Sequence, residues 1–177
     1  MCGIIAYMIR KEDYRYTNLT IFISHFLISV FLALAFGTVH PFANMYVAGK
    51  PVPYILMACL VALPVYAIFG YFFILGKEYL GGMNKVLRVC CFLYLILLLL
   101  LYIACYMMIK YNVSRIAWRY YVILNYPTGV VFNNISLNTD ALNLWFILTT
   151  IPGPLGFYIG SLMRFNYESI SVNKGRK

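Results

Sequence analysis

Residues 89–109 read VCCFLYLILLLLLYIACYMMI and contain no charged side chain. The run includes an unbroken series of leucines at positions 97–101. A helix needs about 20 mostly apolar residues to cross the hydrocarbon core of a bilayer. This stretch is long enough and apolar enough to be a transmembrane helix, and it decides the class of the fold.

Three further runs have the same character. They cover residues 18–39, 52–75 and 141–163, and none contains Lys, Arg, Asp or Glu. Each is apolar around the whole circumference of a helix, as expected where the surroundings are lipid. None alternates with the two-residue period of a membrane β-barrel strand. We therefore expect an all-α, polytopic integral membrane protein: a single membrane domain over residues 1–177 with four transmembrane helices.

The overall composition supports this assignment. The 177 residues are 63% apolar and only 11% charged, and the mean hydropathy is +0.81. Soluble domains are about 25% charged, because a surface in water has to be covered with polar groups. The shortage of charge argues against a water-soluble enzyme domain, and the abundance of apolar residues argues against disorder.

A fifth apolar stretch, residues 116–137, is different. It contains Arg119, and Tyr-Pro-Thr-Gly at 126–129 is a turn signal, because Pro fixes φ and Gly admits positive φ. Trp118 and Tyr120 are residue types enriched at the membrane–water interface. We expect an interfacial or re-entrant segment in a long outer loop, with a fifth transmembrane helix as the alternative.

The positions of the lysines and arginines favour four spans. With four, ten of the 14 basic residues lie on the side of both termini, which the positive-inside rule places in the cytoplasm. These ten are Arg10, Lys11, Arg15, Lys77, Lys85, Arg88, Arg164, Lys174, Arg176 and Lys177. We expect cytoplasmic N- and C-terminal tails at a plasma membrane, and the abundance of Ile, Phe, Tyr, Asn and Lys indicates a bacterial one. The net charge of +9 is then explained by the topology and by attraction to anionic lipid headgroups, and no nucleic-acid partner is expected.

His25 is the one basic or acidic side chain well inside a predicted span. Ionisable groups are costly to bury in a membrane and are therefore functional candidates by default. Imidazole can carry a proton or bind a metal, and Ser29 follows one turn later on the same helix. We take His25 and Ser29 as a candidate intramembrane polar site. The alternative is a neutral histidine that is hydrogen-bonded within the bundle.

The fourth predicted span contains Ile-Pro-Gly-Pro-Leu-Gly at 151–156. Each proline removes a backbone donor and clashes with the preceding turn, so the helix has to kink or break. The freed carbonyls need another helix, a hydroxyl, water or an ion as partner, and some transporters build their sites at such breaks. The candidate site at the break comprises Thr149, Thr150, Pro152, Gly153 and Pro154. The alternative is a kink that serves packing.

Small residues four positions apart mark two candidate packing faces. They are Ala33 with Gly37 in the first predicted span, and Gly156 with Gly160 in the fourth. This spacing lets the backbone of a neighbouring helix approach closely. We expect both faces to serve helix–helix packing.

The sequence supplies no recognisable set of catalytic residues. Its two histidines and five acidic residues form no cluster with metal-ligand spacing. Serine chemistry would need a base in reach and an orienting acid. Ser24 and Ser29 share a helix with His25, but the predicted spans contain no acidic residue and no Gly-x-Ser-x-Gly motif. We therefore predict no catalytic residue, no metal and no cofactor.

These features predict a protein that is not an enzyme. We expect an accessory, regulatory or immunity-type subunit of a larger membrane system, embedded in the lipid bilayer. It would act through helix–helix contacts with another integral membrane protein, or with itself as a homo-oligomer. The alternative is a small oligomeric transporter or channel with its site at the broken fourth helix. An enzyme acting on lipid or polyprenyl substrates is the third hypothesis.

Overall fold

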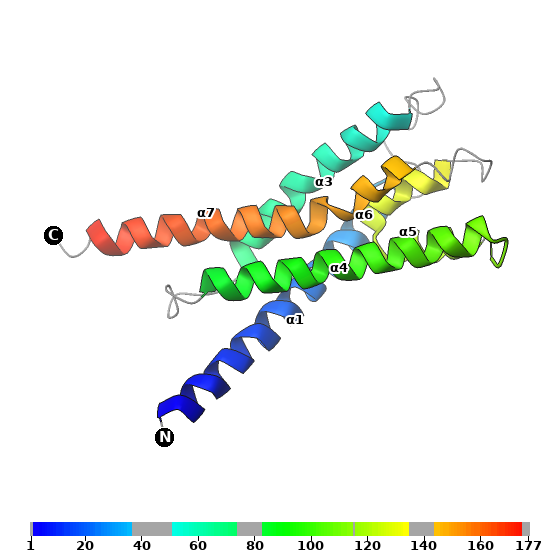
Figure 1. Ribbon diagram of the computed structural model, residues 1–177. Helices are drawn as coiled ribbons and strands as arrows, with labels where there is room; N and C mark the ends of the chain where they lie inside the picture. Colours follow the sequence, from blue (N-terminus) through cyan, green and yellow to red (C-terminus); the bar gives the residue numbers. More distant parts are fainter. Residues whose placement is uncertain (1, 37–50, 74–82, 115, 135–143, 175–177) are drawn as a thin grey trace.

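Every regular element in the described part of the chain is a helix (Figure 1). The computed structural model describes residues 2–36, 51–73, 83–114, 116–134 and 144–174. The long helices are α1 (Cys2–Phe36), α3 (Pro51–Phe73), α4 (Met83–Lys110) and α7 (Pro152–Lys174). The short ones are α5 (Ala117–Leu124), α6 (Tyr126–Gly129) and the 3₁₀ helices η1 (Val130–Asn134) and η3 (Leu144–Thr150). The predicted all-helical class is confirmed.

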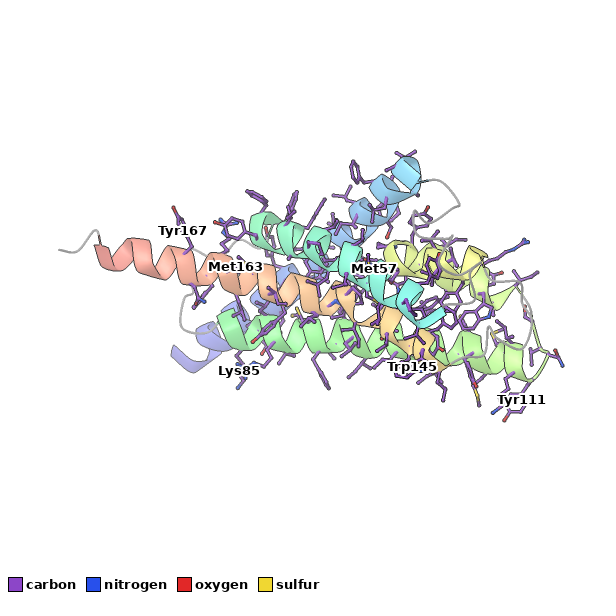
Figure 2. All side chains as sticks on the ribbon, turned by 90° about the horizontal axis from the view of Figure 1, so that it is seen from above. Met57, Lys85, Tyr111, Trp145, Met163 and Tyr167 are labelled. Atoms are coloured by element: carbon purple, nitrogen blue, oxygen red, sulfur yellow. The ribbon has the colours of Figure 1, made fainter. Side chains whose placement is uncertain are left out.

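Four stretches are long and apolar enough to cross a membrane. They are Tyr14–Ala35, Val52–Phe73, Lys85–Lys110 and Leu144–Tyr167, and they fall on the four predicted runs. Successive long helices run in opposite directions, so that α1 begins at the end of the bundle where α7 finishes (Figure 1). Figure 2 shows Lys85, at the start of α4, at the same end as Tyr167, and Tyr111 at the opposite end.

Helices α1 and α7 extend beyond the predicted spans. Helix α1 begins at Cys2 rather than at residue 18, and α7 continues past residue 163 to Lys174. The sequences expected to be tails are therefore largely helical. Charged residues end an apolar run without ending a helix, because Arg, Lys and Glu have high helix propensity. Of the predicted packing residues, Ala33 is half-buried on α1, and Gly37 lies outside the described residues.

Helices α3 and α7 make the most extensive contact in the bundle. A Cβ atom added to Gly156 would lie 2.7 Å from the carbonyl oxygen of Leu63, and one added to Gly160 would collide with the backbone of Ala67. From the other side, a Cβ added to Gly70 would lie 2.6 Å from the carbonyl oxygen of Phe157. The two backbones approach so closely that glycine is required at the crossing, which is the role of small residues in membrane helix pairs.

The chain reverses after α4 in a turn built on Asn112. This residue has a φ of 55°, its N–H donates to the Ile109 carbonyl at 3.0 Å, and the N–H of Val113 donates to the Met108 carbonyl at 2.8 Å. These bonds form a Schellman motif, in which asparagine is the usual substitute for glycine in the left-handed position. The turn directs α5 back along α4, and α6 contacts α1 and α3.

An aromatic core holds these short helices to the long ones. Trp118 of α5 stacks on Phe132 of η1 at 4.2 Å between ring centroids, and Phe132 lies 4.5 Å from Phe146 of η3. Tyr121 meets Phe132 edge-on at 5.4 Å, and Tyr102 of α4 meets Trp118 at 5.7 Å. Such pairs add about 0.5–1.5 kcal/mol each beyond burial of their area. The described short helices α5, η1 and η3 are therefore an integral part of the bundle.

Arg164 joins the end of α3 to α7. Its guanidinium donates hydrogen bonds to the carbonyl oxygens of Tyr71 at 3.2 Å and Phe72 at 3.0 Å. The last carbonyls of a helix have no partner within the helix and form the negative end of its dipole. At the end of the second candidate span, Arg164 therefore supplies donors to two of these carbonyls and a positive charge beside the negative end of the dipole.

Candidate functional site

His25 faces the interior because it lies on the buried stripe of α1. Ile21, Ser24, Ile28 and Leu32 share this stripe with it, at the spacing of one helix face. The His25 side chain is 8% exposed. The side chain of Ser29 is also buried, and its hydroxyl donates to the backbone carbonyl of His25 at 2.8 Å. Ser29 therefore bonds its own helix and not the imidazole.

The hydrogen bonds around the imidazole determine where its proton lies. Nε2 is 2.6 Å from the carbonyl oxygen of Leu124, at the end of α5. A carbonyl oxygen only accepts hydrogen bonds, so Nε2 carries a hydrogen and donates it. In the neutral ring, Nδ1 is then an acceptor with a single lone pair. The candidate site is thus an imidazole oriented by a backbone group of another helix.

Two tyrosine hydroxyls surround Nδ1. The hydroxyl of Tyr66, on α3, lies 2.7 Å from it, and the hydroxyl of Tyr94, on α4, is also in hydrogen-bonding contact. The Tyr66 ring stacks on the imidazole at 5.8 Å between centroids, and the Tyr94 ring meets it edge-on at 5.4 Å. Phe157 of α7 packs against Tyr66 at 5.3 Å. We call His25, Tyr66 and Tyr94 the histidine–tyrosine cluster, and it joins α1, α3, α4 and α5.

A cleft of about 480 Å³ lies beside this cluster. Its lining comes from α1, α4 and α5. The lining residues are Phe22, His25, Phe26, Ser29, Tyr94, Leu97, Leu98, Leu101, Ile123 and Leu124. We call it the α1–α4 cleft. Its polar members are buried and its apolar members include strongly exposed residues, so the polar groups form the inner part.

The break in the fourth candidate span lies at Ile151, between η3 and α7. The N–H of Ile151 donates to the Leu148 carbonyl in the 3₁₀ pattern at 3.2 Å, and Pro152 opens α7. Pro152 has no N–H to donate to Leu148, which is the carbonyl four residues earlier. The Cys59 thiol of α3 lies 3.5 Å from that carbonyl oxygen and donates to it. A neighbouring helix therefore compensates in part for the missing donor.

The Thr149 carbonyl at the break is bonded by two side chains from the preceding segment. The hydroxyl of Thr128 donates to it at 2.6 Å, and the amide nitrogen of Asn125 donates at 3.0 Å. Both donors are buried and lie at the junction of α5 and α6. The sequence suggested another helix, a hydroxyl, water or an ion as the partner of a freed carbonyl. The partners of this carbonyl are a hydroxyl and an amide from a short helical segment.

A directed chain of hydrogen bonds connects these groups. Asn125 donates its second amide hydrogen to the Tyr121 hydroxyl at 2.9 Å. Tyr121 lies 2.7 Å from the Thr149 hydroxyl, which itself donates to the Phe146 carbonyl at 2.6 Å. Because the Thr149 hydrogen is used, Tyr121 is the donor to Thr149. Burial raises the pKa of the Tyr121 phenol above its ordinary value, so this proton is retained.

The remaining predicted residues at the break serve packing. Thr150 donates its hydroxyl to the Ile147 carbonyl at 2.8 Å, within its own helical segment. A Cβ atom added to Gly153 would lie 2.8 Å from the Tyr94 hydroxyl oxygen, so this glycine makes room for the histidine–tyrosine cluster. Pro152 and Pro154 are buried beside it. The break and the histidine–tyrosine cluster are therefore adjacent, because Gly153 lies against Tyr94.

The sequence identified His25 but none of its partners. Buried tyrosines usually find a hydrogen-bond partner, but 17 tyrosines give no indication of which two will face His25. Asn125 and Thr128 were part of a polar segment expected to be a turn, and their role depends on contacts with distant residues. Within the described ranges, no group of three or more His, Cys, Asp and Glu residues lies close enough to hold a metal ion.

In comparisons with known proteins, no protein-family model, no curated protein and no solved structure matches this chain.

Proposed function

We propose that the protein crosses a bacterial plasma membrane four times, with both termini in the cytoplasm and α5, α6 and η1 forming a re-entrant segment. The four apolar stretches and the ten-to-four distribution of basic residues support this topology. The bond between His25, in the middle of the first candidate span, and Leu124 supports the re-entrant segment. Non-helical backbone at membrane depth is tolerated where protein buries it.

Within this topology, the protein is proposed to act as a non-enzymatic accessory, regulatory or immunity-type subunit. The observation that carries this proposal is the directed hydrogen-bond chain at the break. Each of its side-chain donors is bonded to an acceptor within the protein. These donors belong to Asn125, Thr128, Tyr121 and Thr149. Such a network fixes the bundle in one arrangement. It supports a rigid scaffold whose outer faces are its means of interaction.

Helix α1 offers the most prominent of these faces. It diverges from α4 and α7 towards its N-terminal end (Figure 1). Large apolar side chains cover its outward side, and they include Leu19, Ile23, Phe31 and Leu34. Lipid or a partner helix can cover such a surface, and the proposal is that a partner helix does so. That partner is another integral membrane protein or a second copy of this chain.

The test is affinity purification of the tagged chain from its native membrane in a mild detergent. A partner present in a fixed ratio, or a defined homo-oligomer, is expected. Phe31→Ala on α1 should weaken that association, whereas Phe72→Ala on α3 should not. The two phenylalanines are 64% and 65% exposed, which makes them a matched pair. A monodisperse monomer without partners would contradict the proposal.

The transporter or channel alternative requires groups at the break that an ion or substrate can reach. The hydrogen bonds from Thr128 and Asn125 already occupy the Thr149 carbonyl, which makes this alternative the weaker proposal. A flux assay on the protein in liposomes tests it. If the wild type carries a flux and a Pro152→Ala/Pro154→Ala variant loses it, the transporter or channel proposal is favoured and the scaffold proposal is contradicted.

A further inference from the structure

We propose that the α1–α4 cleft binds a lipid-soluble quinone: a planar ring that bears carbonyl groups and an apolar tail. The inference concerns binding only, and it does not depend on the partner proposed above. It rests on the size and lining of the cleft, on its depth along the candidate spans, and on a count of the hydrogen-bond donors in the histidine–tyrosine cluster.

The size and lining of the cleft suit an apolar ligand of moderate size. Its volume of about 480 Å³ lies within the range of about 300–1,000 Å³ that is usual for small-molecule sites. Among the described residues that line it, none is Lys, Arg, Asp or Glu. A charged head would find no counter-ion there, and burying an unpaired charge is costly. The ligand is therefore neutral.

The depth of the cleft indicates that its ligand comes from the bilayer. His25 lies at the middle of the candidate span Tyr14–Ala35, and Leu97 and Leu98 lie at the middle of Lys85–Lys110. The outer lining residues Phe26 and Ile123 are strongly exposed, so the cleft opens sideways between the helices. In a bilayer this opening faces the acyl chains, and a molecule dissolved among them can enter directly.

The histidine–tyrosine cluster has one hydroxyl hydrogen more than Nδ1 can accept. The Tyr66 and Tyr94 hydroxyls both lie within hydrogen-bonding distance of Nδ1, which has a single lone pair. One hydroxyl donates to Nδ1, and the second can donate to the first or to a ligand. Tyr94 lines the cleft and Tyr66 is not among its lining residues, so Tyr94 is the donor available to a ligand.

This donor and its surroundings select the head group. A hydroxyl that donates needs an acceptor, and a carbonyl oxygen is a neutral acceptor that brings no hydrogen of its own to be satisfied in an apolar site. Aromatic rings lie around the Tyr94 hydroxyl. Phe22 meets the Tyr94 ring edge-on at 6.2 Å between centroids, and Phe26 and the imidazole also line the cleft. Rings favour stacked or edge-on contact with another planar ring. Leu97, Leu98 and Leu101 provide the aliphatic wall for a tail.

Binding is tested with the full chain in phosphatidylcholine nanodiscs and a tritium-labelled decyl-benzoquinone. Saturable binding to one site is expected. Decylbenzene has the ring and tail without the carbonyl groups, and it should compete at least about tenfold more weakly, the effect of one well-made hydrogen bond. Methyl decanoate has a carbonyl without the ring and should also compete weakly. If methyl decanoate competes as well as the quinone, the site recognises acyl esters and the quinone assignment is wrong.

Four variants locate the site. Tyr94→Phe should weaken quinone binding about tenfold and leave decylbenzene unaffected. Tyr66→Phe should have the same effect from outside the cleft, because Nδ1 then recruits the Tyr94 hydrogen. Leu97→Trp fills the cleft and should abolish binding of both molecules. Leu93→Trp, one turn earlier on α4 and similarly exposed but outside the cleft, should bind as the wild type does.

The results separate loss of folding from loss of the site. The tryptophan variants change exposed positions, so their comparison stands even if a tyrosine variant fails to fold. Quinone binding that is equal in Leu97→Trp and Leu93→Trp would overturn the location. Unchanged quinone affinity in a folded Tyr94→Phe variant would overturn the assignment of the donor.

Discussion

Nε2 of His25 lies 2.6 Å from the backbone carbonyl oxygen of Leu124, although 99 positions separate the two residues in the chain. The bond joins the middle of α1 to the end of α5. Neither helix can satisfy these two groups locally, so the bond forms only when the short segment has packed into the bundle. His25 therefore couples the packing of α1 to that of α5, and the stability of the bundle should depend on it.

Replacing His25 with alanine should lower the free energy of unfolding by about 2–3 kcal/mol. The variant leaves a cavity and removes the partner of Leu124 and of two tyrosine hydroxyls. SDS-induced unfolding from detergent micelles, followed by circular dichroism, measures the loss. Leu27→Ala is the control on the exposed face of α1 and should cost under about 1 kcal/mol. Equal losses in the two variants would contradict the role of His25.

The hydrogen bonds at the break should prove interdependent. Thr128→Val keeps the shape of the side chain but removes one donor to the Thr149 carbonyl, and it should cost about 0.5–1 kcal/mol. Asn125→Leu removes donors to Tyr121 and to Thr149, and it should cost about 2 kcal/mol. The double variant should lose more than the sum, because the carbonyl then has neither side-chain donor. Strict additivity in the same unfolding assay would argue against a shared acceptor.

Alanine at Gly160 should be strongly destabilising. In a helix without close neighbours, alanine is favoured over glycine by about 1 kcal/mol. At Gly160 the added Cβ collides with the backbone of Ala67, and we expect a loss of about 3 kcal/mol instead. Gly153→Ala should cost less, because the atom it meets is the hydroxyl of a side chain, Tyr94, that can shift. A stabilised Gly160→Ala variant would show that α3 and α7 do not cross so closely.

Chemical labelling tests the re-entrant segment. Val113 and Ile123 are 70% and 68% exposed in the protein itself, so protein alone would not protect either side chain. In a cysteine-free background, Val113→Cys should react with a membrane-impermeant maleimide added outside the cell. Ile123→Cys should stay unlabelled until detergent dissolves the membrane. Labelling of both positions in intact cells would place α5 in water and contradict the proposed topology.

The helical class of the fold follows from the sequence because charge-free runs of about 20 residues are typical of helices that can cross a bilayer. A charge-free run such as 89–109 has few structures open to it, since every backbone group has to be satisfied within the chain. The prolines at 152 and 154 likewise place the break within the fourth candidate span, and η3 gives way to α7 there. The extents of α1 and α7 were underestimated, because a hydropathy pattern marks where an apolar run ends and not where the helix ends.

The partners in the candidate site could not be predicted in the same way. Which tyrosine meets His25 depends on how α3 and α4 rotate and cross, and Gly70, Gly153 and Gly156 determine that through contacts between distant residues. The pairing of Asn125 and Thr128 with Thr149 depends equally on tertiary packing. A single sequence without an aligned set of relatives carries no signal for such pairs. The functions proposed for His25, Ser29 and the break therefore stay predictions.

The 3₁₀ winding of η3 also bears on the thickness of bilayer that the protein fits. A 3₁₀ helix rises about 2.0 Å per residue and an α-helix about 1.5 Å. The fourth candidate span has 24 residues, of which η3 contributes seven, and its contour length is therefore about 40 Å. The 26 residues of the third span reach about 39 Å. The 3₁₀ winding thus gives the two spans nearly equal contour lengths. Both exceed a hydrocarbon core of about 30 Å, so the two spans would tilt to a similar extent to fit it.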